Sequence, residues 1–465
     1  MKNFFNTLFL LAALAVAANA AEPELDDDFS QDSTIINIEH RDRLLAIVSW
    51  PFVRIVQPTV EFLMYPVIPP LIYISRENLI EKGHNLITYG DEGQIMFYPT
   101  INAEIGGASN IGFAYRHANL LFGDDYMLFG PRLYTNADWD ASVFYQKNKI
   151  MSTSFFGELG ASYREMGSND FRDPKNMTYT FADSSVNFYT ALGFNLVSYW
   201  NLKFAVGYNF YRFDWPNISG EIDSSPEAED RGFYKHFNTF PLTVSLFSNT
   251  LDEPYAPTKG SKFSIGYTYA SVSPYSGSKD HNYHAVESRY VRYFLLGNKS
   301  YAMTVAESEA NRERLRNLSF KEAIEILNPI NVREEILERR VLVTQIKARY
   351  MLEENKGKAP FTAMGRLGDN YPLRAYPSGH FTGPLIAGIS TEYRWPIDLY
   401  ADALIFNEYG IFGDDFKNLP LSNLRNSYGF GFRVRTPKLF ITRFALAFHG
   451  KHGVSLVLTT RPDYE

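Results

Sequence analysis

The feature that most constrains this chain is an alternation of apolar and polar residues that runs from about residue 94 to residue 461. In residues 262–269, aromatic and apolar side chains fall on one face of an extended chain, and serine, glycine and threonine fall on the other. In residues 428–435, arginines and glycines share the polar face. Successive side chains of a β-strand point to opposite faces, so this pattern predicts an all-β fold. Alternation alone fits both a soluble β-sandwich and a barrel in lipid, which turns its apolar face outward.

Residues 1–20 have the features of an export signal peptide. Lys2 gives a positive start, residues 8–18 are almost wholly apolar, and residues 18–20 form a small-x-small cleavage site. The mature chain is therefore expected to begin at Ala21. The apolar run is too short to span a bilayer, and an uncleaved anchor is the alternative reading.

The composition favours a barrel in an outer membrane over a secreted sandwich. Aromatic residues make up 16% of the chain, with 37 Phe and 31 Tyr. Outer-membrane barrels place such residues in girdles at both membrane interfaces. After the signal, no window holds the ~20 apolar residues that a membrane helix needs. The chain has no cysteine, and loss of Lys2 takes the formal net charge from −7 to −8, which argues against nucleic acid as a partner.

The length of the barrel region sets the expected number of strands. A spanning strand takes ~10 residues and its share of the connections about as many, so residues 94–461 hold about sixteen antiparallel transmembrane strands once a helical stretch at 300–339 is set aside. An even number places both chain ends on the periplasmic side. Residues 462–465 then form a short C-terminal tail.

The helical stretch at 300–339 is expected to be an insertion in a periplasmic turn. Ser319 and Glu322 form a capping box that opens a run with helical apolar spacing. By strand parity the insertion leaves the tenth strand and enters the eleventh. One interpretation is a docking surface for a periplasmic or outer-membrane protein partner. The other is a turn that carries extra residues without a binding role.

Residues 21–93 differ from the chain that follows. Residues 21–34 are acidic and polar, which predicts a disordered tail. From residue 41, apolar residues follow a helical period that Pro51 and later prolines interrupt, which predicts a short amphipathic helical segment. Both a plug beneath the barrel and a helix at the membrane interface fit this pattern. A linker with apolar side chains is the alternative.

Four segments in the second half of the chain resemble motifs of one protein family. Residues 250–260 resemble the turn before the ninth strand, residues 389–396 the twelfth strand, and residues 406–410 stand where the thirteenth strand carries a motif. An inward-folded outer loop, expected at 355–384, carries the motif of the sixth outer loop: Leu373, Arg374, Ala375, Tyr376, Gly379, Phe381 and Gly383. In order and spacing, these segments are similar to the BamA/TamA superfamily of outer-membrane barrels, also called the bacterial surface antigen family.

The resemblance implies a sixteen-stranded barrel that inserts or translocates other proteins. It also implies that Arg374 points into the lumen and meets Glu392 on the twelfth strand and Glu408 on the thirteenth. A guanidinium presents five donors in a fixed fork and pairs bidentately with carboxylates. Such a pair would hold a long loop whose ordering costs entropy. A solvated loop arginine without a partner is the alternative.

The chain departs from the family pattern in two respects. Ala375 stands where the family has glycine, and a positive φ at that position would strain an alanine. Residues 21–93 leave room for at most one small domain and lack the strand and helix pattern of the soluble POTRA domains that recruit substrates. We therefore expect a member of the superfamily that lacks POTRA domains.

The seam where the first and last strands meet is expected to be weak. Pro99 lies inside the first strand, 95–105, and cannot donate to a β-ladder. The last strand, which contains Val454, Leu456 and Leu458, is short. A weak seam suits a barrel that opens sideways into lipid, and it also suits a barrel whose seam is covered by residues 41–75.

The sequence thus predicts a bacterial outer-membrane barrel that is not an enzyme and takes no cofactor. It would insert or translocate proteins or lipids, or form the barrel scaffold of a complex, in contact with outer-membrane lipids including lipopolysaccharide. A passive polar channel and an outer-membrane enzyme are the alternatives. His281 with His284, and His449 with His452, lack a nearby third ligand in sequence, so no metal site is predicted. The oligomeric state is not predicted.

Overall fold

The computed structural model describes the following residues: 59, 73, 79–90, 93–104, 109–121, 123–135, 138–151, 153–172, 178–197, 199–214, 234–253, 257–274, 281–296, 340–354, 359–368, 372–396, 401–416, 419–435, 440–449 and 453–460. The chain divides into two compact units. One consists of Met1–Tyr65 with Asp415–Leu419, and the other of Pro66–Asp414 with Pro420–Glu465. The β-sheet belongs to the second unit.

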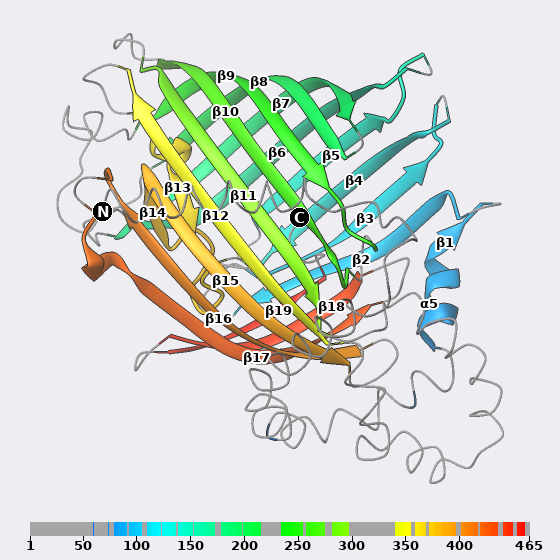
Figure 1. The fold of residues 1–465 in the computed structure, drawn as a ribbon. Coiled ribbons are helices and arrows are strands. Elements are labelled where there is room, and N and C mark those ends of the chain that lie inside the picture. Colours follow the sequence, from blue (N-terminus) through cyan, green and yellow to red (C-terminus); the bar gives the residue numbers. More distant parts are fainter. Residues whose placement is uncertain are drawn as a thin grey trace, which may run out of the picture. The chain divides into compact units, whose positions relative to one another are not determined.

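Sixteen antiparallel strands of this unit form a closed barrel, in which each strand pairs with the next one along the chain and the last pairs with the first (Figure 1). The predicted all-β fold and the predicted number of strands are therefore confirmed. The barrel strands are β2 (Ile95–Glu104), β3 (Asn110–Ala118), β4 (Asp125–Tyr134), β5 (Trp139–Lys147), β6 (Phe155–Arg172), β7 (Thr178–Val197), β8 (Trp200–Asp214), β9 (His236–Asn249), β10 (Gly260–Pro274), β11 (Tyr283–Leu295), β12 (Val341–Glu353), β15 (Leu385–Pro396), β16 (Ala401–Gly413), β17 (Arg425–Arg435), β18 (Phe440–Phe448) and β19 (Val454–Thr459).

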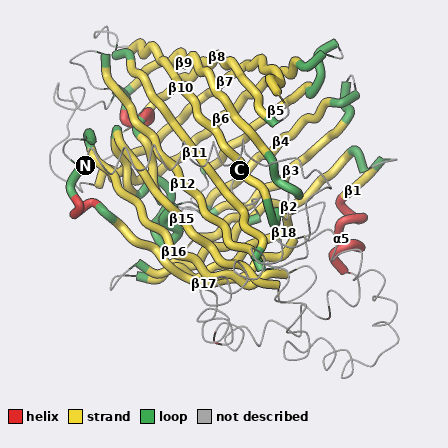
Figure 2. The backbone as a smooth tube through the Cα atoms, in the orientation of Figure 1, coloured by secondary structure: helices red, strands yellow, loops and turns green. Residues whose placement is uncertain are grey.

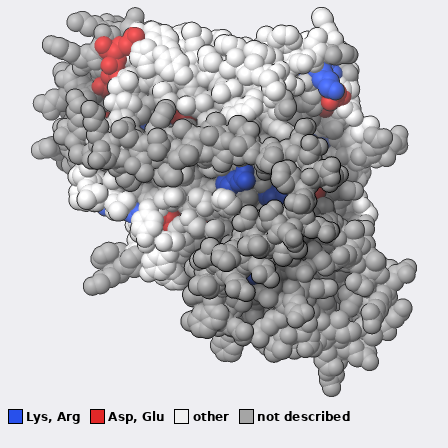
Figure 3. All heavy atoms as spheres, viewed as in Figure 1, with Lys and Arg blue, Asp and Glu red and all other residues white. Residues whose placement is uncertain are grey.

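The alternation seen in the sequence becomes an apolar outside and a polar inside. On β10, Ile265 and Tyr267 are exposed, and so are Leu192 on β7 and Leu242 on β9. Charged side chains are instead buried, as Glu392 and Arg394 of β15 and Asp402 and Glu408 of β16 are. Most of the described surface on the face drawn in Figure 3 carries no charge. This arrangement is the inverse of a soluble β-sandwich and is typical of a barrel in lipid.

A segment between β12 and β15 enters the barrel and fills part of its lumen. It contains a 3-10 turn, η2 (Phe361–Ala363), and a small hairpin of β13 (Gly365–Leu367) and β14 (Phe381–Gly383). The hairpin contacts β12, β15 and β16 on one wall and β6 on another. Strands dominate the tube in Figure 2, and Figure 1 labels the hairpin strands β13 and β14 beside β12 and β15.

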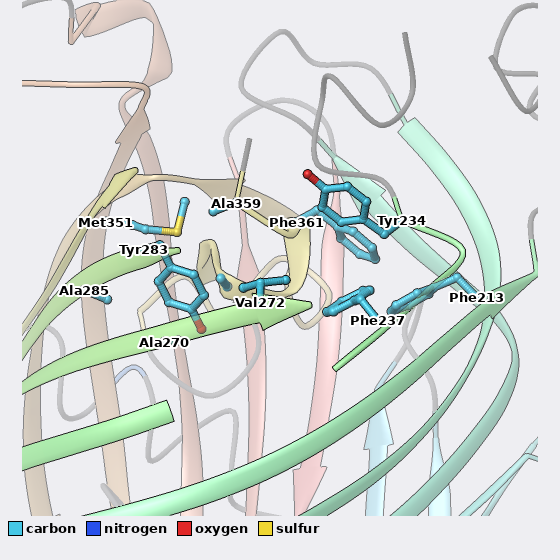
Figure 4. Close-up of a cluster of buried hydrophobic side chains, with 11 residues drawn as sticks. Phe213, Tyr234, Phe237, Ala270, Val272, Tyr283, Ala285, Met351, Ala359 and Phe361 are labelled. Carbon is cyan, nitrogen blue, oxygen red and sulfur yellow. The ribbon is translucent and has the colours of Figure 1, made fainter. Parts of the chain in front are cut away.

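Apolar side chains pack η2 against the barrel wall. The cluster in Figure 4 joins strands β8 to β12 to the residues around η2, and Phe361 contacts Phe213 edge to face at 4.9 Å. Phe213 also stacks on Phe237. Because buried aromatic pairs of this kind add to the free energy gained from area burial, the cluster holds the loop in one position. Its buried members are Phe213, Tyr234, Phe237, Ala270, Val272, Tyr283, Ala285, Met351, Ala359, Phe361 and Ala363.

The seam between β19 and β2 is short. Its paired residues are Val457 with Glu104, Leu458 with Ala103, and Thr459 with Asn102. Pro99 lies on β2 outside this stretch and is opposite Phe113 of β3. Val454 and Leu456 have partners on β18.

A short element outside the barrel occupies the other end of the seam. The helix α5 (Leu79–Ile87) leads directly into β1 (Thr88–Tyr89), whose two residues pair with Met96 and Ile95 of β2. On one side, Met96 and Ile95 already pair with β3. β1 therefore lies on the other edge of β2, the edge that faces β19. The edge left open by the short last strand is therefore partly covered by the chain itself.

Several predicted segments lie outside the described residues. These are the signal peptide at 1–20, the acidic tail at 21–34, the helical insertion at 300–339 and the tail at 462–465; within 41–75 only residues 59 and 73 are described. The insertion does fall between the tenth and eleventh barrel strands, β11 and β12, as strand parity predicted. Among the residues that the structure describes, no helix is long and apolar enough to cross a membrane.

Candidate functional site

Two tight turns place Arg374 at the inner end of the lumen hairpin. The backbone amide of Tyr376 donates to the carbonyl of Leu373 over 3.0 Å, and that of His380 donates to the carbonyl of Pro377 over 3.0 Å. Leu373 has a φ of +81°, a conformation that costs a non-glycine residue about 1–3 kcal/mol. The strain expected at Ala375 is absent, because the positive φ falls two residues earlier. An alanine therefore fits where the family has glycine.

The structure brings Arg374 together with the carboxylates of Glu392 and Glu408. Nη1 of Arg374 lies 2.6 Å from Oε2 of Glu392, and Nε lies 2.9 Å from Oε1 of Glu408. All three side chains are fully buried. The guanidinium also lies over the ring of Phe406, 4.0 Å from its centroid, which adds a cation–π contact. A single arginine thus links the loop to two adjacent strands, β15 and β16.

Glu408 also binds the loop backbone. Its Oε2 accepts hydrogen bonds from the amides of Leu373 (2.9 Å) and Arg374 (2.7 Å). Its Oε1 accepts one from the Ser390 hydroxyl (3.1 Å). The next amide, that of Ala375, donates to the hydroxyl of Ser427 on β17 over 3.0 Å. Ser427 and the backbone contacts could not be predicted from the sequence, because they depend on strand register.

Two further arginines on the same wall are paired and buried. Arg394 forms an ion pair with Glu392, which is thereby shared with Arg374. Arg433 on β17 lies 2.8 Å from Asp402 of β16, directly opposite it in register. The alternation had placed Arg433 on the polar face, but its partner was not predicted. The result is a set of buried ion pairs of both signs on β15, β16 and β17.

Two glycines on the wall make room for the loop. A Cβ on Gly388 would lie 2.1 Å from Cγ of Pro372, and a Cβ on Gly410 would lie 2.8 Å from Cδ1 of Leu373. Both distances are shorter than real carbon contacts, so a larger residue at Gly388 would displace the proline ring of the loop, and one at Gly410 would shift at least the Leu373 side chain. The close approach lets the amides at 373 and 374 reach Glu408.

This fold is similar to that of solved outer-membrane barrels. The crystal structure of BamA from Haemophilus ducreyi lacking POTRA domains 1–3 matches with a TM-score of 0.54 and 14% identity, over 79% of this chain and 70% of that chain. CdiB from Acinetobacter baumannii (TM-score 0.46, 8% identity, 79% and 60% of the two chains) and CdiB from Escherichia coli (0.47, 8%, 78% and 62%) also match. No protein-family model and no curated protein matches the sequence. The chain has the BamA-type barrel fold.

The remaining motif residues of this BamA-type barrel form the outer part of the hairpin. Tyr376 packs against His449 at 4.5 Å and against Phe381 at 4.8 Å between ring centroids. Phe381 in turn stacks on Phe412 of β16. Gly383 lets the hairpin approach the wall, since a Cβ there would lie 3.0 Å from the carbonyl oxygen of Gly413.

A second motif of the BamA-type barrel, the turn between β9 and β10, depends on Asp252. One oxygen of this carboxylate accepts hydrogen bonds from the amides of Thr258 (2.9 Å) and Lys259 (3.2 Å). Gly260 has a φ of +100°, and a Cβ there would lie 2.1 Å from the carbonyl oxygen of Thr250. The sequence of this turn is thus explained by local geometry. The carboxyl of Glu253 is partly buried beside Asp252, and both effects raise its pKa.

The described histidines of the two sequence pairs contact other side chains. His281 stacks on Tyr234, and His284 lies between Tyr267 and Glu354, with a 2.9 Å contact from its Nε2 to the Glu354 carboxylate. His449 packs on Tyr376, and His452 lies outside the described residues. Over the described ranges, no group of three or more His, Asp or Glu side chains could hold a metal ion.

Proposed function

We propose that this chain is a bacterial outer-membrane barrel of the BamA type. It inserts or translocates proteins or lipids, or forms the barrel scaffold of an outer-membrane complex. The observation that carries this proposal is the loop pinned inside a closed barrel by Arg374 between Glu392 and Glu408. Such a buried arrangement is costly to build, so it favours a role that needs the loop in one defined position.

The filled lumen favours this role over that of a passive polar channel. The residues around η2 pack on strands β8 to β12, and the hairpin packs on β15 and β16. A steady channel needs a water-filled path, as in porins, whereas a lumen occupied by an ordered loop conducts only when the loop moves.

The role also fits the absence of an assembled catalytic group among the candidate residues. The buried carboxylates Glu392, Glu408 and Asp402 are each engaged by an arginine. Charges neutralised in this way position the loop and the strands. We therefore propose a role that is not enzymatic.

The proposed contacts are lipid on the outside and protein at the periplasmic edge. The exposed apolar side chains on the outer face of the strands suit acyl chains, including those of lipopolysaccharide. Residues 300–339, between β11 and β12, are the proposed docking surface for a periplasmic or outer-membrane protein.

A reconstitution experiment tests the insertion role. The purified protein is placed in liposomes, and the folding rate of an added, urea-unfolded small outer-membrane barrel is followed by its shift on a cold gel. We expect folding to be several-fold faster than in empty liposomes and in liposomes that hold an unrelated barrel. Equal rates, together with a large and steady conductance of the intact protein, would favour the passive channel.

Pull-down from native outer membranes tests the scaffold role. Proteins that copurify with the intact chain are compared with those that copurify with a chain lacking residues 300–339. We expect at least one partner to be lost with this segment. An unchanged set of partners would end the docking proposal but leave the insertion experiment unaffected.

A further inference from the structure

Arg366 on the lumen hairpin is a cation without a protein partner in the described residues. Its neighbour Leu367 is fully buried, whereas the Arg366 side chain is exposed within the barrel. No hydrogen bond or ion pair reaches it from the part of the chain that the structure describes. Gly379 leaves it space, since a Cβ at that position would lie 3.3 Å from Cδ of Arg366. A cation enclosed in a barrel lumen normally has a carboxylate beside it, as Arg374 and Arg433 do.

The walls that face Arg366 carry more cations. Arg349 of β12 binds the carbonyl of Ala363 over 2.8 Å, which ties it to the same loop. Its other amino group lies 2.8 Å from Glu287 of β11, and Lys347 shares that carboxylate at 3.8 Å. Directly across from Lys347 in register is Arg289.

The opposite wall adds a further pair. Arg164 on β6 and Asp183 on β7 lie 3.7 Å apart, and the charges of both act on Arg366. The guanidinium of Arg366 is a permanent cation at ordinary pH. Cations thus outnumber carboxylates in this described part of the lumen.

Like charges held close together in an enclosed space repel one another unless an anion lies between them. Guanidinium groups match the oxygens of phosphate bidentately, and lysine adds a point charge. The side chains here come from the loop and from both walls, so an anion among them would face cations from all three.

We propose that Arg366, with Arg349 and Arg164 on the facing walls, forms a binding site for a phosphate-like oxyanion in the lumen. The oxyanion is either free inorganic phosphate or the phosphate of a lipid headgroup. When bound, it links the hairpin to β12 and β6 and stabilises the inward position of the loop. The site is separate from the set of ion pairs around Arg374.

Isothermal titration of the purified full-length barrel tests this site. Inorganic phosphate is added to protein in phosphate-free detergent solution. We expect saturable binding that weakens at least tenfold in Arg366→Gln and is largely retained in Arg366→Lys. Lys82→Gln, which removes an exposed charge on α5, is the matched control and should bind as the parent does. Heat resistance on a gel shows that each variant is folded.

Absence of saturable phosphate binding in the parent, or equal binding in folded Arg366→Gln, would overturn the proposal. Phosphorus analysis of protein purified from native membranes distinguishes the two sources. Lipid phosphate that copurifies with the parent but not with Arg366→Gln identifies a headgroup. Equal amounts of copurified lipid phosphate in the parent and in Arg366→Gln, together with weaker phosphate binding by Arg366→Gln in the titration, identify the free anion.

Discussion

At the scale of single residues, Arg374 holds the loop through charge and shape together. Its side chain pairs with two carboxylates and its amide donates to one of them. The family resemblance of the motif implied the pairing with Glu392 and Glu408, and alternation along β15 placed Glu392 on its polar face. The partners of the backbone could not be predicted, since Ser427 lies opposite Glu408 only through the register of β16 and β17.

Replacing Arg374 by alanine should destabilise the barrel by about 3–5 kcal/mol, because it leaves the buried carboxylate of Glu408 without its cation, whereas Glu392 keeps Arg394. Arg374→Lys keeps the positive charge but loses the forked guanidinium, so its stability should lie between that of the parent and that of Arg374→Ala. The midpoint of urea unfolding in detergent, followed by tryptophan fluorescence, gives the measurement. Lys259→Ala, at an exposed position, is the control. Equal midpoints for Arg374→Ala and the parent would mean that the pairs add nothing to stability.

Gly388 offers a test that leaves every charge in place. Gly388→Ala puts a methyl group where Pro372 now lies, so we expect the loop to shift away from β15 and become more open to proteases. Gly130→Ala is the matched control, because a Cβ there meets only the Phe113 carbonyl oxygen at an ordinary 3.5 Å. Limited proteolysis of both folded variants makes the comparison, and identical cleavage rates would contradict the seating of the loop on this glycine.

At the scale of elements, strand number and order could be predicted because each needs only length and alternation. The seam could not be predicted in detail. The shortness of β19 was visible in the sequence. The pairing of β1 with Met96 and Ile95 was not, because residues 88 and 89 of β1 show no strand pattern of their own. A two-residue strand carries no periodicity, so only tertiary contact defines it.

A disulfide across the seam should strengthen the barrel more than one placed elsewhere. The chain has no cysteine, so Ala103→Cys with Leu458→Cys forms a single defined bond between paired positions. Opening of a seam with few paired residues is expected to precede unfolding. Oxidation should therefore raise the temperature at which the barrel unfolds on a gel by several degrees. The control pair, Ala447→Cys with Ser455→Cys, joins β18 to β19 inside the sheet. An equal or larger gain in the control would show that the seam is not the weak point.

At the scale of the whole molecule, the polar interior of the barrel and the loop that fills it depend on each other. The wall supplies paired charges near β15, β16 and β17, and an apolar cluster near β8 to β12, and the hairpin with η2 bridges them. An inward loop was predicted from its motif, but the apolar cluster was not. Phe213, Phe237 and Phe361 follow no local pattern that separates a lumen aromatic from one in an interfacial girdle.

Deletion of residues 371–383 should therefore open the lumen. We expect the intact protein to show small, intermittent conductance in planar bilayers, and the deletion variant to show larger and steadier conductance, because the segment contains Arg374 and most of the hairpin contacts. Deletion of residues 223–230, between β8 and β9, is the control and should leave the conductance near that of the parent. Large, steady conductance before any deletion would show that the loop does not block the lumen in a membrane. Retention of small conductance after deletion, in a barrel that still resists heat on a gel, would mean that other parts of the chain block the path.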